Sequence, residues 1–223
     1  HRGIIFAPSN GRTMPSQNTD GGRVFQNPVL HFFSRTHIAV PLVLFYSIGG
    51  LACWYSVSHY HLDLTATIAL LVAGAFFFTL IEYLAHRNLY HMGVSGSPRK
   101  AKVQYLLHGF HHDHPRDKRR LALPPAVSLV LAAVFMSLFC LVMGVHGLAF
   151  GGGFMCGYAS YLGVHYAVHV FPPPHNVLGV LWKHHNLHHY VGDTGGFGVS
   201  SPLWDLVFGT MPVDPRKKAA AKA

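Results

Sequence analysis

The sequence predicts an all-α integral membrane protein, in which four transmembrane helices in two hairpins carry a cytoplasmic helical cap with a histidine-rich dimetal site. Three observations lead to this fold class. Half of the 223 residues are hydrophobic and only 11% are charged, whereas soluble domains carry about 25% charged residues. The apolar residues gather into four runs of membrane-spanning length. Nineteen histidines are present, and most of them cluster just outside these runs.

The chain divides into three parts. Residues 1–37 are rich in Gly, Pro, Ser and Asn and predict an irregular arm that ends in an interfacial segment. A membrane-embedded domain follows over residues 38–215, and residues 216–223 form a basic tail. Within the domain, each apolar run predicts a transmembrane helix, because about 20 apolar residues cross a ~30 Å hydrocarbon core. The four predicted spans are 38–57, 62–81, 126–145 and 148–168.

Short links join these spans into two hairpins, and the positive charges orient them. All 17 Lys and Arg lie in the N-terminal arm, in residues 82–123, or after the fourth span, and neither short link contains one. The positive-inside rule therefore places both termini and the histidine clusters on the cytoplasmic side. The formal net charge of +9 indicates anionic lipid headgroups as the partner and not nucleic acid. Glycines at 151–153 in the fourth span predict close helix packing.

Two histidine clusters carry the strongest metal-binding pattern. His108, His111 and His112 stand at positions i, i+3 and i+4, which share one face of an α-helix. Three neutral imidazole nitrogens are therefore expected to converge on one point. The same spacing recurs within residues 185–189. Two such clusters on one side of a membrane predict a metal site.

Two histidine pairs complete the predicted ligand set. His165 and His169 are one helical turn apart. His86 and His91 are five residues apart, about 140° on an α-helix, so they face one site only if the helix loosens or ends between them. One metal cannot use all of these ligands, whereas two six-coordinate metals with about five each fit, and imidazole suits Fe, Zn, Cu and Ni. The predicted ligands are His86, His91, His108, His111, His112, His165, His169, His185, His188 and His189.

Acidic residues are expected behind these ligands, because a ligating imidazole usually donates its second N–H to a carboxylate or a carbonyl. Glu82 precedes His86 by four residues and shares its helical face. His184 shares the phase of its neighbours poorly and is expected to be structural. The candidate acids are Glu82, Asp113, Asp193 and Asp205.

The ordered motifs resemble one known family. The run Glu82-Tyr-Leu-Ala-His86-Arg with His91, followed by the three later clusters, resembles the fatty acid hydroxylase and sterol desaturase superfamily. Residues 112–125, which begin His-Asp-His-Pro-Arg-Asp and end Leu-Pro-Pro, resemble its fatty acid 2-hydroxylase branch. So do residues 196–210, which begin Gly-Phe-Gly-Val-Ser-Ser-Pro-Leu-Trp-Asp.

The resemblance implies a membrane-bound, O2-dependent oxidoreductase that hydroxylates a lipid acyl chain at the 2-position of a fatty acid or fatty acyl lipid. It implies two metal ions, iron in the active form with zinc allowed in the isolated protein. It also implies an external electron donor. Because the chain has no His-Pro-Gly-Gly haem signature, the donor is expected to be a separate protein, such as cytochrome b5 or ferredoxin with its reductase, or a domain upstream of His1.

Alternative functions remain at this point. A sterol methyl oxidase or desaturase, an ether-lipid monooxygenase or a carotenoid hydroxylase would use the same ligands. The membrane helices are expected to form an apolar slot for the lipid, and the shape of this slot would determine the substrate. A membrane metal transporter or metal-binding protein is the non-enzyme alternative. Transporters place their ligands near the bilayer midplane, whereas these histidines lie past the ends of the predicted spans or, for His165, in the last turn of the fourth span. Residues 195–202 are expected to form a lid over the slot.

Overall fold

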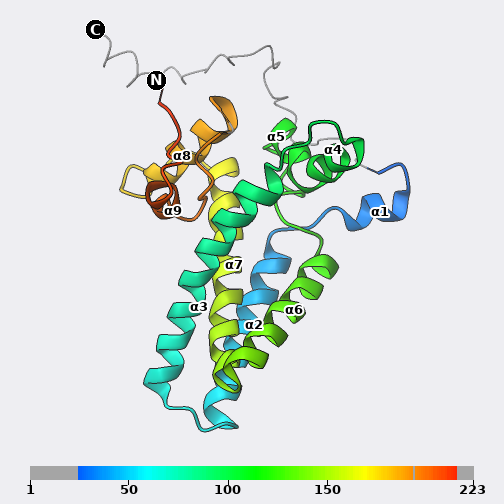
Figure 1. Ribbon diagram of the computed structural model, residues 1–223. Coiled ribbons are helices and arrows are strands. Elements are labelled where there is room, and N and C mark those ends of the chain that lie inside the picture. The colour runs from blue at the N-terminus through cyan, green and yellow to red at the C-terminus, as the bar shows by residue number, and fades with distance from the viewer. Residues whose placement is uncertain (1–24, 193, 215–223) are drawn as a thin grey trace. The chain divides into compact units, whose positions relative to one another are not determined.

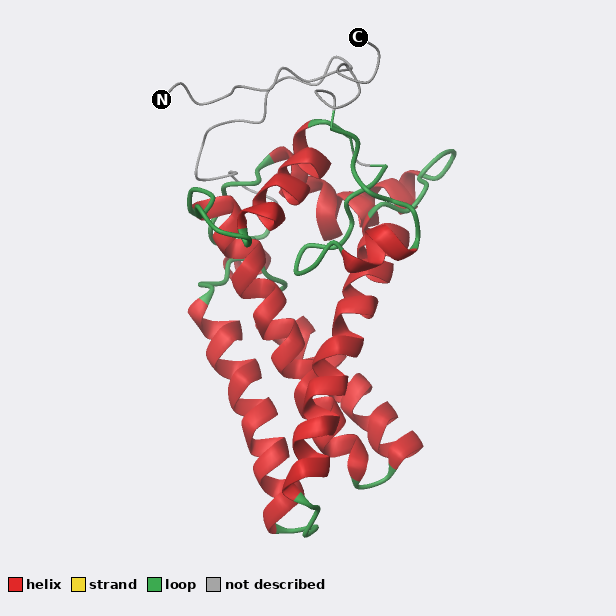
Figure 2. Cartoon of the chain, turned by 90° about the vertical axis from the view of Figure 1, so that its left-hand side faces the viewer, coloured by secondary structure: helices red, strands yellow, loops and turns green. Residues whose placement is uncertain are grey.

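The computed structural model describes residues 25–192 and 194–214, and over these residues it consists of helices and loops without a strand (Figures 1 and 2). The all-α prediction is therefore confirmed for this part of the chain. Most of the predicted arm and the basic tail lie outside the described residues. In chain order the elements are α1 (Pro28–Phe33), α2 (Ala39–Ser58), α3 (Leu64–Ala85), the π-helix η1 (His86–Tyr90), α4 (Pro98–Gln104), the π-helix η2 (Tyr105–Gly109), α5 (Phe110–Asp113), α6 (Pro125–Met143), α7 (His146–Val170), α8 (Gly179–Tyr190) and α9 (Leu203–Val207).

These elements belong to two compact units, each of which is described by itself. The bundle unit comprises the described residues up to Ile81 together with 117–167. The histidine unit comprises 82–116 and the described residues from Val168 onward. Helices α3 and α7 each contribute residues to both units.

Four long helices, α2, α3, α6 and α7, correspond to the four predicted spans. Three of them are long and apolar enough to cross a membrane: α2, α3 with its π-helical extension to Tyr90, and α6. Helix α7 has 25 residues, which is sufficient length, but its glycines and histidines lower its hydropathy and it is not among the three. The chain is a membrane protein by these helices.

The core of the bundle unit consists of aromatic side chains contributed by all four long helices. Phe154 of α7 contacts Phe78 of α3 and Phe139 of α6 with ring centroids 5.1 Å and 5.2 Å apart. Phe45 of α2 meets Tyr158 edge-on at 4.9 Å. Such pairs favour edge-to-face geometry because ring faces are negative and ring edges positive. Packing contacts of this kind drive helix association in a membrane, where lipid tails are as apolar as the side chains.

Glycines let α7 approach its neighbours at backbone distance, as the sequence predicted. A Cβ added at Gly153 would collide with the Leu71 carbonyl group of α3. A Cβ added at Gly49 of α2 would collide with the Cys156 sulfur of α7. Any larger side chain at these two positions would therefore push α2 or α3 away from α7.

Proline and glycine set the ends of the long helices. Pro125 occupies the first position of α6, where its missing N–H costs no hydrogen bond. Gly144, with φ of 59°, ends α6 and starts the short link to α7. Three prolines from Pro172 follow the last turn of α7. The links α2–α3 and α6–α7 lie at the same end of the bundle (Figure 1).

Candidate metal centre

Ten imidazoles were predicted as ligands, and nine of them lie in the histidine unit, where they form two groups. Within each group the potential ligand nitrogens all lie within 4.8 Å of one another. The first group is His86, His91, His108, His112 and His188. The second group is His111, His169, His185 and His189. His165, the remaining predicted ligand, is assigned to the bundle unit and stands one turn before His169 on α7.

The nitrogen–nitrogen distances fit a metal with near-right-angle geometry. In the first group His108 Nε2 lies 2.9 Å from His86 Nε2 and 3.0 Å from His112 Nε2. In the second, the Nε2 atoms of His169 and His185 are 2.8 Å apart. A metal–nitrogen bond of about 2.1 Å separates neighbouring ligand nitrogens by about 3.0 Å at a right angle and about 3.4 Å at the tetrahedral angle. The observed distances match the right angle, and five imidazoles exceed the four ligands of a closed zinc site.

Each predicted cluster of three is divided between the two groups, so the expectation that three imidazoles converge on one point is wrong. His108 and His112 belong to the first group, whereas His111 belongs to the second. Helix α8 does the reverse, since His188 joins the first group while 185 and 189 join the second. The reason is angular, because positions i and i+4 are about 40° apart and position i+3 lies about 60° to the other side.

The two groups are neighbours. The rings of His112 and His189, one from each group, stack with centroids 4.2 Å apart and an interplanar angle of 21°. His111 Nε2 lies 3.1 Å from His189 Nε2 within the second group. Since adjacent residues serve adjacent groups, the arrangement can hold two metals side by side.

A π-helical turn explains how His86 and His91 reach one group. The predicted condition was that the helix loosens between them, and it does so in η1. The backbone N–H of His91 donates to the His86 carbonyl at 3.2 Å, an i to i+5 hydrogen bond. The wider turn brings the fifth residue round to the same side, and single π-turns often occur at functional sites. A second one, η2, contains His108.

One histidine of each group, His108 and His189, has a pKa lowered by burial, which favours the neutral form that binds metals. Burial lowers the pKa of His108 well below 6.5, and the neighbouring imidazoles of His86 and His112 lower it further. Burial likewise lowers the pKa of His189, followed by the effect of His112 and His185. Several imidazolium charges in so small a volume would repel one another, so the imidazoles remain neutral. A bound cation could then accept the lone pairs that their nitrogens direct towards one point.

Backbone carbonyls fix two rings of the first group. His86 Nδ1–H donates to the Phe197 carbonyl at 2.6 Å, and His188 Nδ1–H donates to the Gly195 carbonyl at 2.9 Å. A carbonyl only accepts, so Nδ1 carries the proton and the lone pair is on Nε2 in both rings. This is the usual support of a metal-binding histidine. The sequence did not reveal these two carbonyls, because every residue has a backbone carbonyl and none is marked by its residue type.

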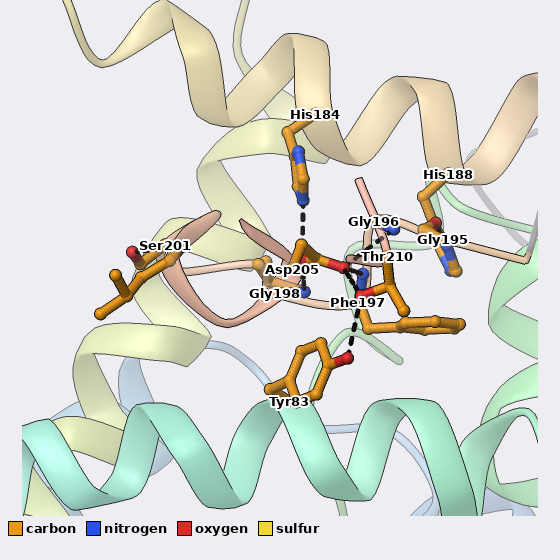
Figure 3. Close-up of polar contacts among 12 residues, drawn as sticks. Tyr83, His184, His188, Gly195, Gly196, Phe197, Gly198, Ser201, Asp205 and Thr210 are labelled. Carbon is orange, nitrogen blue, oxygen red and sulfur yellow. Dashed lines mark hydrogen bonds and ion pairs between the residues drawn. The ribbon is translucent and has the colours of Figure 1, made fainter. Parts of the chain in front are cut away.

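The two carbonyls lie in a buried loop, residues 195–199, and Asp205 holds that loop from within (Figure 3). The Asp205 side chain is fully buried and accepts the backbone N–H groups of Gly196, Phe197 and Gly198 at 3.1, 2.9 and 2.7 Å. Thr210 Oγ1 and His184 Nε2 also donate to it, at 2.8 and 3.0 Å. Burial acts to raise the pKa of Asp205, but these donors outweigh burial and lower it.

Glu82 holds the other end of the same loop. Its Oε1 accepts the backbone N–H groups of Val199 and Ser200 at 2.6 and 2.9 Å, and the Ser200 hydroxyl donates to Oε2. Residues 195–202 were expected to form a lid; within this range residues 195–199 are buried, and the backbone N–H groups of residues 196–200 are hydrogen-bonded to Asp205 or Glu82. Of the other predicted acids, Asp113 is exposed and bonds Tyr105. Asp193 lies outside the described residues.

Comparison with known proteins gives a consistent set of relatives. The family model described as fatty acid hydroxylase matches residues 71–210. The dihydroceramide fatty acyl 2-hydroxylase FAH2 of Arabidopsis thaliana is 36% identical over 213 residues, covering 91% of this chain and 84% of that protein. The fatty acid 2-hydroxylase of Rattus norvegicus is 34% identical over 214 residues, covering 85% and 56%. A solved structure titled full-length scs7p, with only its hydroxylase domain visible, matches with a TM-score of 0.78 and 32% identity, covering 86% of this chain and 72% of that one.

Proposed function

This chain belongs to the fatty acid hydroxylase family, and from that premise we propose that it hydroxylates a lipid acyl chain at its 2-position. The observation that carries the proposal is the pair of neighbouring all-imidazole groups. Relatives named as 2-hydroxylases of dihydroceramide fatty acyl groups and of fatty acids support an acyl lipid as the substrate. A ceramide-type lipid is the first substrate to test.

The reaction needs a redox metal pair. In balanced form, R–H, O2, two electrons and two protons give R–OH and H2O, so an external donor must supply two electrons. Two iron ions held by the imidazole groups would supply the O2-activating chemistry that an unactivated C–H bond requires. The ten predicted histidines are the proposed ligands, with His165 completing the second group from α7.

The chain's own residues contribute positioning and a dry environment. Burial keeps His108 and His189 neutral, so their lone pairs are available near pH 7. The carbonyls of Gly195 and Phe197 hold two rings with Nε2 as the ligand atom. A buried, preorganised ligand set limits rearrangement during the reaction and excludes bulk water.

The membrane arrangement that we infer has four spans in two hairpins, with α7 as the fourth span. The Lys and Arg residues support an orientation with both termini and the metal groups on the cytoplasmic side. The electron donor then reaches the metals from that side, as a separate protein such as cytochrome b5 or ferredoxin with its reductase. Helices α2, α3 and α6 expose many large apolar side chains, which is consistent with contact with lipid.

The test is oxygen-18 labelling. The full chain is reconstituted with iron, a reductase chain and vesicles containing ceramide and fatty acid, and ¹⁸O2 is supplied. We expect one ¹⁸O atom at carbon 2 of the acyl chain by tandem mass spectrometry, and none when H2¹⁸O replaces ¹⁸O2 as the label source. A filled metal site that yields no labelled acyl lipid would contradict the proposal, and label only in a sterol or carotenoid would favour another oxidation of the superfamily.

A further inference from the structure

Asp205 accepts five hydrogen bonds, yet none of their donors is a histidine of the two groups. Its donors are three loop N–H groups, the Thr210 hydroxyl and His184. His184 itself belongs to neither group. Burying a carboxylate costs free energy unless it is fully hydrogen-bonded. The complete set of donors around Asp205 therefore indicates a specific role for this side chain.

We propose that Asp205 is a positioning residue for the first metal group: it orders the loop carbonyls that select the tautomer and the ring orientation of His86 and His188. This inference deepens the metal-binding part of the proposed function and rests on it. It differs from the sequence expectation that an acid would accept a ligand N–H directly, because the carboxylate acts through the backbone.

The route from Asp205 to the two imidazoles is short and continuous. Its Oδ1 accepts the N–H groups of Gly196 and Phe197, and its Oδ2 accepts that of Gly198 (Figure 3). The Gly195 carbonyl shares a peptide unit with the Gly196 N–H, and the Phe197 carbonyl shares one with the Gly198 N–H; these two carbonyls accept the Nδ1–H of His188 and of His86. The C=O and N–H groups of a trans peptide point in opposite directions, so N–H groups that face the carboxylate direct their carbonyls towards the rings.

The backbone of the loop is special as well as bonded. Gly196 has φ of 80°, a conformation that L side chains adopt only with strain. A Cβ at Gly198 would collide with the Ser201 carbonyl. The Thr210 carbonyl accepts the Gly196 N–H at 2.8 Å, and the Tyr83 hydroxyl bonds Thr210 Oγ1 at 2.8 Å. Both ends of the Asp205 contact are therefore fixed to the rest of the histidine unit.

Both imidazoles that the loop holds belong to the first group. Disturbing the loop should therefore weaken the first metal site while the second retains its metal. Support of this kind is typically worth about 10- to 100-fold in metal affinity. An amide at position 205 suits the test because it keeps the shape but replaces one acceptor oxygen with a donor, which would face either the Gly198 N–H or the other two.

The experiment measures iron and zinc per chain, by mass spectrometry of the metals, in the purified full chain during titration with a chelator. Wild type should hold two metals, and Asp205→Asn should release one of them at about 10- to 100-fold lower chelator concentration. Thr210→Val is the matched control, because it removes one donor to Asp205 and leaves the three loop contacts. Combining Asp205→Asn with His111→Ala should release both metals, which identifies the first group as the one affected.

A second variant protects the test against misfolding. Gly196→Ala strains the same loop without touching the carboxylate and should release the same metal, whereas Gly192→Ala, exposed and with nothing within 4 Å of its Cβ, should behave as wild type. Two metals retained at wild-type affinity in both loop variants, or both metals lost together in folded protein, would overturn the inference. A wild-type chain that binds no metal would instead refute the proposed function.

Discussion

Adjacent residues His111 and His112 are predicted to hold different metals, and this can be tested by counting metals in pairs of alanine variants. His112 shares the first group with His188, and His111 shares the second with His185. His111→Ala/His112→Ala should therefore weaken both sites. His112→Ala/His188→Ala and His111→Ala/His185→Ala should each weaken one site and leave one metal bound.

The size of the effect follows from the number of ligands. A structural zinc site with four ligands binds with about 10–16 kcal/mol, so one ligand accounts for about 2.5–4 kcal/mol, or about 60- to 700-fold in affinity. Loss of two ligands from one group should empty it at ordinary chelator concentrations. The intact group is close by, with rings 4.2 Å apart between His112 and His189, but it keeps all of its own nitrogens.

The assay measures metal content per folded chain after dialysis against a chelator. The elution volume in size-exclusion chromatography serves as the check on folding. His175→Ala is the matched control, since this exposed histidine follows the proline run and belongs to neither group. If His111→Ala/His112→Ala keeps one tightly bound metal while His112→Ala/His188→Ala keeps none, the division of each cluster between two metals is wrong. Equal metal loss in His175→Ala would show that the readout reports something other than the ligands.

Three further outcomes are expected. Gly153→Val should force α3 and α7 apart and cost about 1–3 kcal/mol, lowering the melting temperature of detergent-solubilised protein, while Gly50→Ala, with nothing within 4 Å, should leave it unchanged; equal shifts would refute the packing argument. Tyr83→Phe removes a buried hydroxyl that bonds Arg87 and Thr210 and should cost about 0.5–1.5 kcal/mol per lost bond; a rise in melting temperature would contradict this. The pKa of Asp205 lies below its usual 3.8, so the ionised carboxylate should stabilise the folded protein by a constant amount above that pH and lose this contribution as pH falls through the lower folded pKa. The difference in melting temperature between wild type and Asp205→Asn should therefore be constant from about pH 5 to 8. A strong pH dependence of that difference in this range would refute the assignment.

The long helices could be predicted closely because their signal is local. The third predicted span, 126–145, corresponds to Pro125–Met143, and its ends coincide with a proline and with the φ-positive Gly144. The fourth, 148–168, lies within His146–Val170. Apolar run length and turn residues determine these bounds, and neither depends on the rest of the fold.

The candidate ligands were predictable as residues but not as two sets. Spacing alone identified the nine histidines that the histidine unit brings together. Which metal each one faces depends on where α5 and α8 lie relative to one another, and that arrangement is set by tertiary packing. His111 illustrates this, because its helical face includes His108, while a partner in its group, His189, comes from 78 residues further along the chain.

The support of the ligands was the least predictable part, because it consists of backbone atoms. Glu82 and Asp205 were identified as acids near the histidines, but both are hydrogen-bonded to the loop 195–200 and not to a ring of the two metal groups. A lid was expected at residues 195–202, whereas the backbone N–H groups of residues 196–200 are each hydrogen-bonded to Asp205 or Glu82. Glycine is required in this loop for the φ of 80° at Gly196 and for close approach of the backbone. A glycine that serves either purpose cannot be distinguished in the sequence from one that makes a segment flexible.

The division of the clusters also has a mechanical consequence. The segment carrying His108 to His112 gives two nitrogens to the first group and one to the second, and α8 gives one and two. A rigid shift of either segment must therefore disturb both groups, while a change in the loop acts on the rings of His86 and His188 in one group only. Two metals bound in this way would keep a fixed separation, because neither could move unless the two segments that also bind the other metal moved with it. Simultaneous weakening of both metals thus indicates a displaced segment, and weakening of one indicates a lost ligand or a lost support.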